Sequence, residues 1–156
     1  MSKESAAKVL YSTLCQTLDN MNWKYNKEED EFIIRTSAVG EDLSMKLMMR
    51  IDADRQVMYL KSPMPFEVPT VARDTIGKAV LIANFSMLNG SFEFDHNDGY
   101  LAFKMVIPYM GSMISEEVCK YMILLSCSMT DKFNDKFQSL VEGSMSLDEF
   151  EQFANA

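Results

Sequence analysis

Apolar residues recur along this chain with two different periods, and these periods divide it into helices and strands. In residues 3–21 the apolar positions return every three or four residues, which is typical of a helix with one buried face. In residues 43–51 every second position is apolar and most of the positions between them are polar. Because side chains alternate across a strand, this segment predicts a strand with one buried face and one wet face.

The same reasoning assigns the rest of the chain. Helical spacing recurs over 70–87 and again after Ser115, where an apolar stripe continues to about residue 140. Strand-like runs occupy 32–36, 55–61, 90–95 and 100–105, and three prolines make 62–69 a connector. Gly143 is a plausible helix stop, and the sequence from Ser146 to Glu149 matches a capping box that opens a last short helix.

Two short turns suggest how the strands pair. A two-residue turn at Ala53-Asp54 places Asp52 opposite Arg55 and Met49 opposite Met58. The Asp-Gly pair at 98–99 lies between two alternating runs and is a strong hairpin signal.

The second hairpin has two possible registers. A turn at Asp98-Gly99 pairs Phe92 with Met105 and lets Glu93 face Lys104. A turn centred on residues 97–98 keeps the same faces inside but loses the match between Glu93 and Lys104.

Together these elements predict one α+β domain spanning residues 1–156. Its antiparallel five-stranded sheet is flanked by helices, in the order α-β-β-β-α-β-β-α plus a short C-terminal helix. Residues 142–156 contain four acidic residues and no Lys or Arg, so the final helix is expected to form an acidic tail.

Composition and charge narrow the class of protein. The net charge of −8 and the lack of a basic cluster argue against nucleic-acid binding, which needs a basic footprint. No apolar run approaches the roughly 20 residues of a membrane span. The first residues lack the apolar core of a secretory signal, and three cysteines form no CxxC pair, so we expect the cytoplasm.

No residue pattern predicts a catalytic or metal centre. His96 is the only histidine and lies in a loop whose Asn, Asp and Gly residues are explained by turn chemistry. Cys15, Cys119 and Cys127 fall near apolar helix faces, as buried cysteines commonly do. The six glycines are scattered and form no phosphate loop. We therefore expect a protein that is not an enzyme and that needs no cofactor.

One stretch of the chain resembles a known family. Asn84 at the end of the second helix, the run 90–95, the run 98–103 and the helix opening at 115–117 resemble the YbjN-like family, which has the type III secretion chaperone-like fold. That family is known mainly as a sensory or stress-regulation group. Secretion chaperones of this fold are small acidic homodimers that hold a partner chain against apolar patches, and the resemblance implies a similar role here.

Six residues are the candidates for contacting a partner protein. If the pairing above is right, the outer face of the sheet carries Met48, Val57 and Tyr59, and predicted loops carry Phe66, Met110 and Met113. A helix or a second subunit covering these residues is an equally good interpretation. The sequence favours a non-enzymatic protein-binding module, chaperone-like or regulatory. The alternative is a small-molecule sensor or enzyme with a pocket between helix and sheet.

Overall fold

The computed structural model describes residues 1–156 and adds one strand to the predicted order of elements. Its helices are α1 (Lys3–Asn20), α2 (Arg73–Phe85), α3 (Glu116–Glu142) and α4 (Leu147–Ala154), and its 3-10 helices are η1 (Glu29–Glu31) and η2 (Thr70–Ala72). Its strands are β1 (Tyr25–Glu28), β2 (Ile33–Val39), β3 (Ser44–Asp52), β4 (Val57–Pro63), β5 (Ser91–Phe94) and β6 (Leu101–Pro108).

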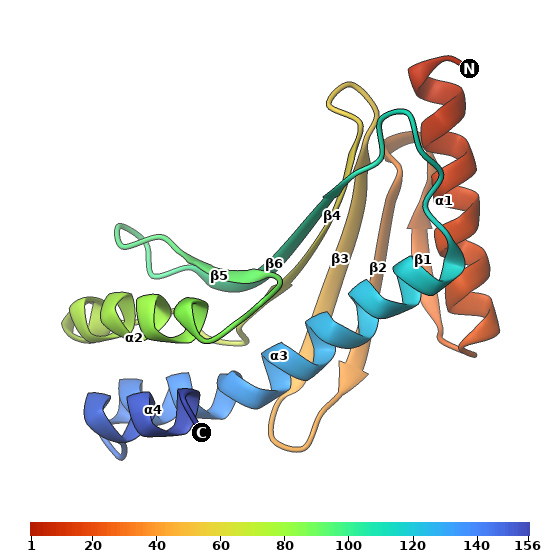
Figure 1. Ribbon diagram of the computed structural model, residues 1–156. Helices are drawn as coiled ribbons and strands as arrows, with labels where there is room; N and C mark the ends of the chain where they lie inside the picture. Colours follow the sequence, from red (N-terminus) through yellow and green to blue (C-terminus); the bar gives the residue numbers. More distant parts are fainter.

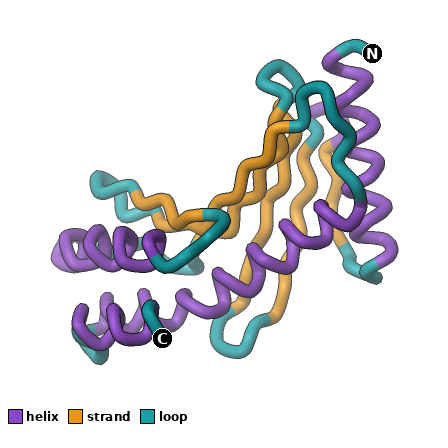
Figure 2. The backbone as a smooth tube through the Cα atoms, in the orientation of Figure 1, coloured by secondary structure: helices purple, strands orange, loops and turns teal.

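All the strands form one antiparallel sheet in the order β1-β2-β3-β4-β6-β5. The sheet bends sharply, so that β5 and the neighbouring half of β6 turn away from the long strands β2 to β4 (Figure 1). The four helices lie on one side of the sheet: α1 covers one end, α2 and α4 lie near β5, and α3 runs between them (Figures 1 and 2). The other side of the sheet carries no helix.

The prediction of an antiparallel sheet packed by helices is confirmed, but the predicted number of five strands is wrong. The sheet has six strands, because the segment Tyr25–Glu28 pairs with β2 as an edge strand. Three of its four residues are exposed, so it lacks the alternation of apolar and polar residues that marks a half-buried strand. Phe32 adopts a left-handed conformation, with φ of 52°, in the turn that brings β1 back along β2.

The hairpin of β3 and β4 has the predicted faces but a different register. Met49 pairs with Leu60, two residues beyond the predicted partner, and Asp52 pairs with Val57. The turn therefore contains four residues instead of two. Arg55 still reaches Asp52 from within that turn, with 2.9 Å between Nη1 and Oδ2. A shift by two residues leaves every side chain on its original face, so the predicted buried side is unchanged.

The hairpin of β5 and β6 adopts the second of its two possible registers. Phe92 pairs with Phe103, which corresponds to a turn centred on residues 97–98. The expected loss of the contact between Glu93 and Lys104 is wrong, because the two side chains meet diagonally with 3.0 Å between Oε2 and Nζ. Long side chains can reach diagonal neighbours on one face of a sheet.

The core fills the space between the sheet and the helices. Phe92 of β5 lies edge-on to Phe137 of α3, with 5.0 Å between the ring centroids, and Phe137 also packs against Phe150 of α4 at 5.3 Å. Phe133 and Phe103 extend this cluster, and the phenylalanines in it are almost completely buried. The short C-terminal helix is therefore part of the main core, and its acidic residues lie on its outer side.

The predicted start and end of the long C-terminal helix and the predicted start of the last helix are confirmed, whereas the second helix is shorter than the predicted 70–87. The Ser115 hydroxyl accepts a hydrogen bond from the backbone N–H of Val118 at the start of α3. Gly143 ends that helix in a left-handed conformation, with φ of 79°. At α4 the Ser146 hydroxyl accepts from the Glu149 N–H while the Glu149 carboxylate accepts from the Ser146 N–H, which completes the capping box.

Candidate binding surfaces

Two surfaces stand out, and the first is the side of the sheet that no helix covers. Met48, Val57 and Tyr59 all lie there, as the alternation in the sequence predicted, and each is half-buried. Their inward neighbours, such as Met49 and Met58, are completely buried in the core. The outer face of the sheet is thus an open surface of mixed apolar and charged side chains.

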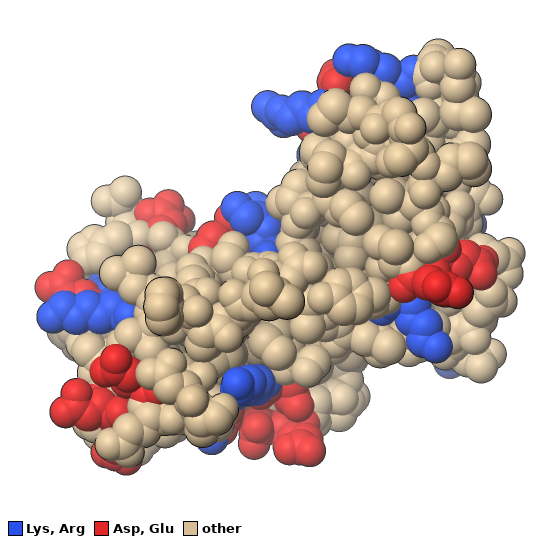
Figure 3. Space-filling view, in the orientation of Figure 1, with Lys and Arg blue, Asp and Glu red and all other residues tan.

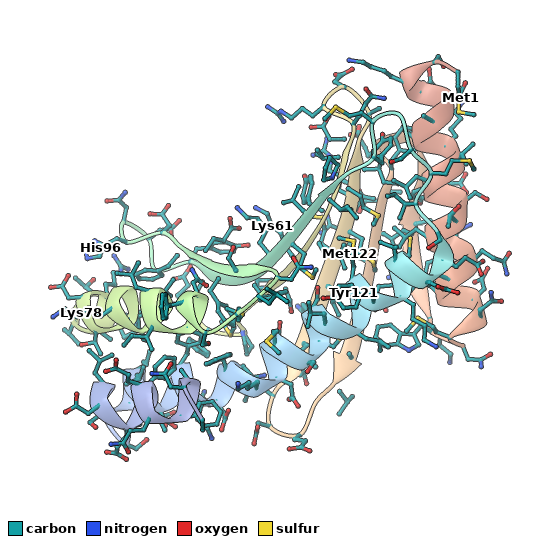
Figure 4. The ribbon with its side chains drawn as sticks, viewed as in Figure 1. Met1, Lys61, Lys78, His96, Tyr121 and Met122 are labelled. Carbon is teal, nitrogen blue, oxygen red and sulfur yellow. The ribbon has the colours of Figure 1, made fainter.

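An ion-pair network occupies the middle of this outer face. Lys61 of β4 and Lys104 of β6 are direct partners in the sheet, so two like charges face each other. Glu93 of β5 lies between them, with its Oε1 2.9 Å from Lys61 Nζ and its Oε2 3.0 Å from Lys104 Nζ. Glu93 Oε1 is buried and makes no hydrogen bond, so its contact with Lys61 is an ion pair. Figure 4 shows Lys61 where the sheet bends, on the side away from the helices.

The network changes the acid–base properties of its members. Burial by itself raises the pKa of the Glu93 carboxyl, but the two ammonium groups outweigh it, so the pKa is lowered overall. Contact with Glu93 raises the pKa of Lys61. Glu93 and Lys61 are therefore charged at neutral pH, and the carboxylate offsets the repulsion between the two lysines.

Replacing Glu93 with glutamine is expected to lower the free energy of unfolding at neutral pH by about 1–2 kcal/mol, since it leaves two facing lysines without a counter-charge. Because the folded-state pKa of Glu93 is lowered, its stabilisation is present above the ordinary glutamate pKa and is lost as pH falls through the folded-state value. Urea denaturation as a function of pH should show this part of the pH dependence in the wild type and not in the variant.

Glu28 provides the matched control for that experiment. It forms an ion pair of 2.9 Å with Arg35, but both side chains are about half exposed. Glu28→Gln should therefore cost less than about 0.5 kcal/mol. Equal losses from the two variants would show that the pairing of Lys61 with Lys104 gives Glu93 no special role.

Two adjoining cavities open on the outer face and share the residues Lys46 and Pro63. The first, which we call the basic cavity, has a volume of about 470 Å³ and includes Met48 in its lining. The second, which we call the proline cavity, has a volume of about 510 Å³ and includes Phe66 and Tyr100. Met48 and Phe66, which are far apart in the sequence, are therefore brought to neighbouring sites.

The remaining candidates lie elsewhere. Val57 and Tyr59 line neither cavity. Met110 and Met113 belong to the loop that follows β6, and they are 60% and 82% exposed. Met113 lines a small cavity of about 40 Å³ beside α1. Because Val57 pairs with Pro108, this loop leaves the sheet at the opposite end of β4 from Phe66, so the structure does not bring Phe66 together with these methionines.

The second surface is an apolar patch that the sequence analysis did not single out. On α2, Leu81 is 72% exposed and Phe85 is 91% exposed, and Leu88 is fully exposed just after the helix. Tyr121 and Leu124 are about half exposed on α3, which contacts α2. We call these five residues the α2–α3 patch. Figure 3 shows a broad band without charged side chains across the middle of the molecule, and Figure 4 places Tyr121 in that region.

The sequence does indicate this patch, but the spacing of the apolar residues alone does not reveal it. The buried side of α2 needs only Ile76, Ala79, Val80 and Ala83. Leu81 and Phe85 are additional apolar residues on the opposite side of the same helix. Apolar residues on both sides of a helix indicate that the helix is covered on more than one side. Here the folded chain covers only one of them.

The cysteines and the histidine do not form a reactive site. Burial raises the pKa of the Cys119 and Cys127 thiols to about 11 and also raises that of Cys15, so all three are protonated at neutral pH. His96 lies in the loop between β5 and β6, where its Nε2 contacts Asp74 Oδ1 at 2.9 Å. The candidate binding sites of this protein are therefore its two surfaces.

The comparisons with known proteins bear on the fold. No family model matches the sequence, and a search of curated proteins finds no match. Among solved structures, this chain is similar to YbjN from E. coli, a proposed transcription regulator, with a TM-score of 0.63. The match covers 85% of this chain and 92% of that one. The chain has a YbjN-like fold. The sequence identity is 13%, so the likeness to YbjN is one of fold. No helix has both the length and the apolar composition that crossing a bilayer requires.

Proposed function

We propose that this protein is a non-enzymatic, cytoplasmic protein-binding module with a regulatory or chaperone-like role, and that it acts as a homodimer. The α2–α3 patch carries this proposal. Five exposed apolar side chains on or beside two helices that contact each other are more than the single exposed apolar residues normal on a surface, and such a group usually marks an interaction site. The YbjN-like fold is compatible with a regulatory role, since YbjN itself is a proposed transcription regulator.

A second copy of the chain is the occupant that fits the patch best. The chain carries a net charge of −8, so two copies repel unless they meet through a surface without excess acid. The α2–α3 patch has none, and its surroundings carry both signs: Asp74 and Lys78 on α2, and Glu117 and Lys120 on α3. A surface of mixed sign can pair with itself across a two-fold axis.

The size of the patch also suits an interface between two copies of the chain. From the fractional exposures and the 150–250 Å² of a whole aromatic side chain, we estimate that its five side chains present on the order of 600 Å². A standard interface buries about 800 Å² on each partner, including a polar rim. The patch therefore supplies the apolar centre of an interface of ordinary size.

Phe85→Glu tests the proposal directly. We expect the wild type to sediment as a dimer and the variant as a monomer, with a dissociation constant raised at least about 100-fold, because a charge would be buried at the centre of the interface. Since Phe85 is exposed in the monomer, the circular dichroism spectrum should not change.

Val39→Glu is the control, because Val39 is 93% exposed but lies on β2, outside the patch. It should leave the dimer intact. A wild-type protein that remains monomeric across the accessible concentration range would overturn the homodimer. A dimer unaffected by Phe85→Glu and Leu81→Glu would show that copies meet through another surface.

The alternative function is a small-molecule sensor or an enzyme with a pocket between helix and sheet. A cavity of about 380 Å³ does lie where α1 meets the β1–β2 turn, lined in part by Tyr11, Lys27 and Asp30. Five of its eight lining residues are polar or charged, whereas small-molecule sites are lined mostly by apolar residues. A metabolite that raises the melting temperature, and loses that effect on Tyr11→Ala, would support this alternative.

A further inference from the structure

We infer that the basic cavity and the proline cavity together bind a short protein segment in which carboxylate side chains adjoin apolar ones. This site lies on the outer face of the sheet, apart from the α2–α3 patch. The inference goes beyond the proposed function because it assigns a second binding site and the chemistry of its ligand.

The charge around the basic cavity is the first reason. Its lining contains Lys24, Arg35 and Lys46 and no carboxylate, although acidic residues outnumber basic ones in the chain as a whole. Such a local reversal of sign attracts anionic groups.

Two of the three cations are also free to bind. Lys24 and Lys46 form no ion pair within the chain, whereas Arg35 uses Nε to contact Glu28 at 2.9 Å and keeps its terminal nitrogens available. The position of Lys24 is fixed, because its backbone carbonyl accepts a hydrogen bond of 2.7 Å from the Thr36 hydroxyl. The backbone of Lys24 is therefore held in place beside β2.

The proline cavity supplies apolar contacts directly beside these charges. Pro63, Pro65, Phe66 and Tyr100 contribute to its lining, and Lys46 and Pro63 join it to the basic cavity. Prolines lose little conformational entropy on binding, and an aromatic ring offers a large contact area. A ligand that spans both cavities needs carboxylates at one end and apolar side chains at the other.

A protein segment satisfies this requirement better than a nucleic acid does. The proline cavity also contains Glu67 and Asp98, which repel a continuous row of phosphates. Separate acidic side chains can avoid these carboxylates while they contact Lys46. A peptide also supplies the apolar groups that the prolines and Phe66 can contact.

Selection of random displayed peptides on the full-length protein tests the inference. We expect the selected peptides to be enriched in Asp and Glu next to apolar residues. Their affinity should fall at least about tenfold on Lys46→Glu, and less on Lys46→Ala, and it should weaken as salt is added. Lys8→Glu, an exposed charge reversal on α1, is the matched control and should leave binding unchanged.

Three results would overturn the inference: selected peptides without acidic enrichment, affinities that do not respond to either change at Lys46, and a single-stranded oligonucleotide that displaces the peptides at equal concentration. Selection of no peptide at all would also reject it. None of these results concerns the dimer, which is tested separately through Phe85, so failure of this site and failure of the proposed function are distinguishable.

Discussion

Replacing Phe150 with alanine is expected to lower the free energy of unfolding by about 3–5 kcal/mol, since it removes a completely buried aromatic ring and leaves a cavity. Phe150 packs against Phe133 and Phe137 with 5.8 Å and 5.3 Å between ring centroids, and it is the main side chain through which α4 reaches the core. The measurement is equilibrium unfolding in urea, followed by circular dichroism and by tryptophan fluorescence.

Phe153 on the same helix is the matched control. Its ring is only partly buried and lies near the ammonium groups of Lys132 and Lys136, at 5.7 Å and 5.0 Å. Phe153→Ala should therefore cost about 1–2 kcal/mol, a smaller loss than at Phe150. If Phe150→Ala costs less than 1 kcal/mol, α4 is an appendage that the main core does not require.

The helices and the faces of the strands could be predicted because their apolar residues repeat with a regular period. The alternation in residues 43–51 specified which side of β3 is buried, and Met48 was correctly placed on the other side. The lengths of the turns could not be predicted in this way. A change of two residues in a turn alters the register but preserves the faces, so the pattern is equally consistent with both.

Strand β1 could not be predicted from the pattern of apolar and polar residues, for a different reason. Its four residues, from Tyr25 to Glu28, form an edge strand that is exposed along most of its length. Such a strand is held by backbone hydrogen bonds to β2. Every residue except proline can form these bonds, so they do not require a particular order of apolar and polar side chains. Charged residues in a short edge strand also suit its exposed position.

The candidate surfaces depend on contacts between distant segments, which a single sequence does not specify. Lys24, Lys46 and Pro63 meet at one cavity only because β1 to β4 are neighbours in the sheet. The α2–α3 patch likewise joins residues about 40 positions apart. The sequence does contain the excess of apolar residues on α2, but only the packing of α2 shows that one side of this helix remains uncovered.

Gly99→Ala should be the second most damaging of these substitutions, with a loss of about 3 kcal/mol or more. The sequence identified Gly99 as a turn glycine, and its φ of 83° agrees with that role. The structure adds a second constraint: a Cβ at this position would lie 2.2 Å from the backbone carbonyl oxygen of Val68. Because that oxygen belongs to the main chain, the clash can be relieved only by moving the connector away from the hairpin.

Gly111 separates the two causes. Its φ is 65°, but a Cβ there would meet no atom within 4 Å, so Gly111→Ala should cost only the 1–2 kcal/mol of a left-handed alanine. The difference between the two variants in urea denaturation measures the close approach of Val68 to the hairpin. That approach includes a hydrogen bond of 2.9 Å from the Val68 N–H to the Gly99 carbonyl oxygen. Because the same connector carries Phe66, a displaced connector should also weaken peptides selected on the proline cavity. Equal losses of stability at Gly99 and Gly111 would show that turn conformation alone explains why glycine is needed at 99.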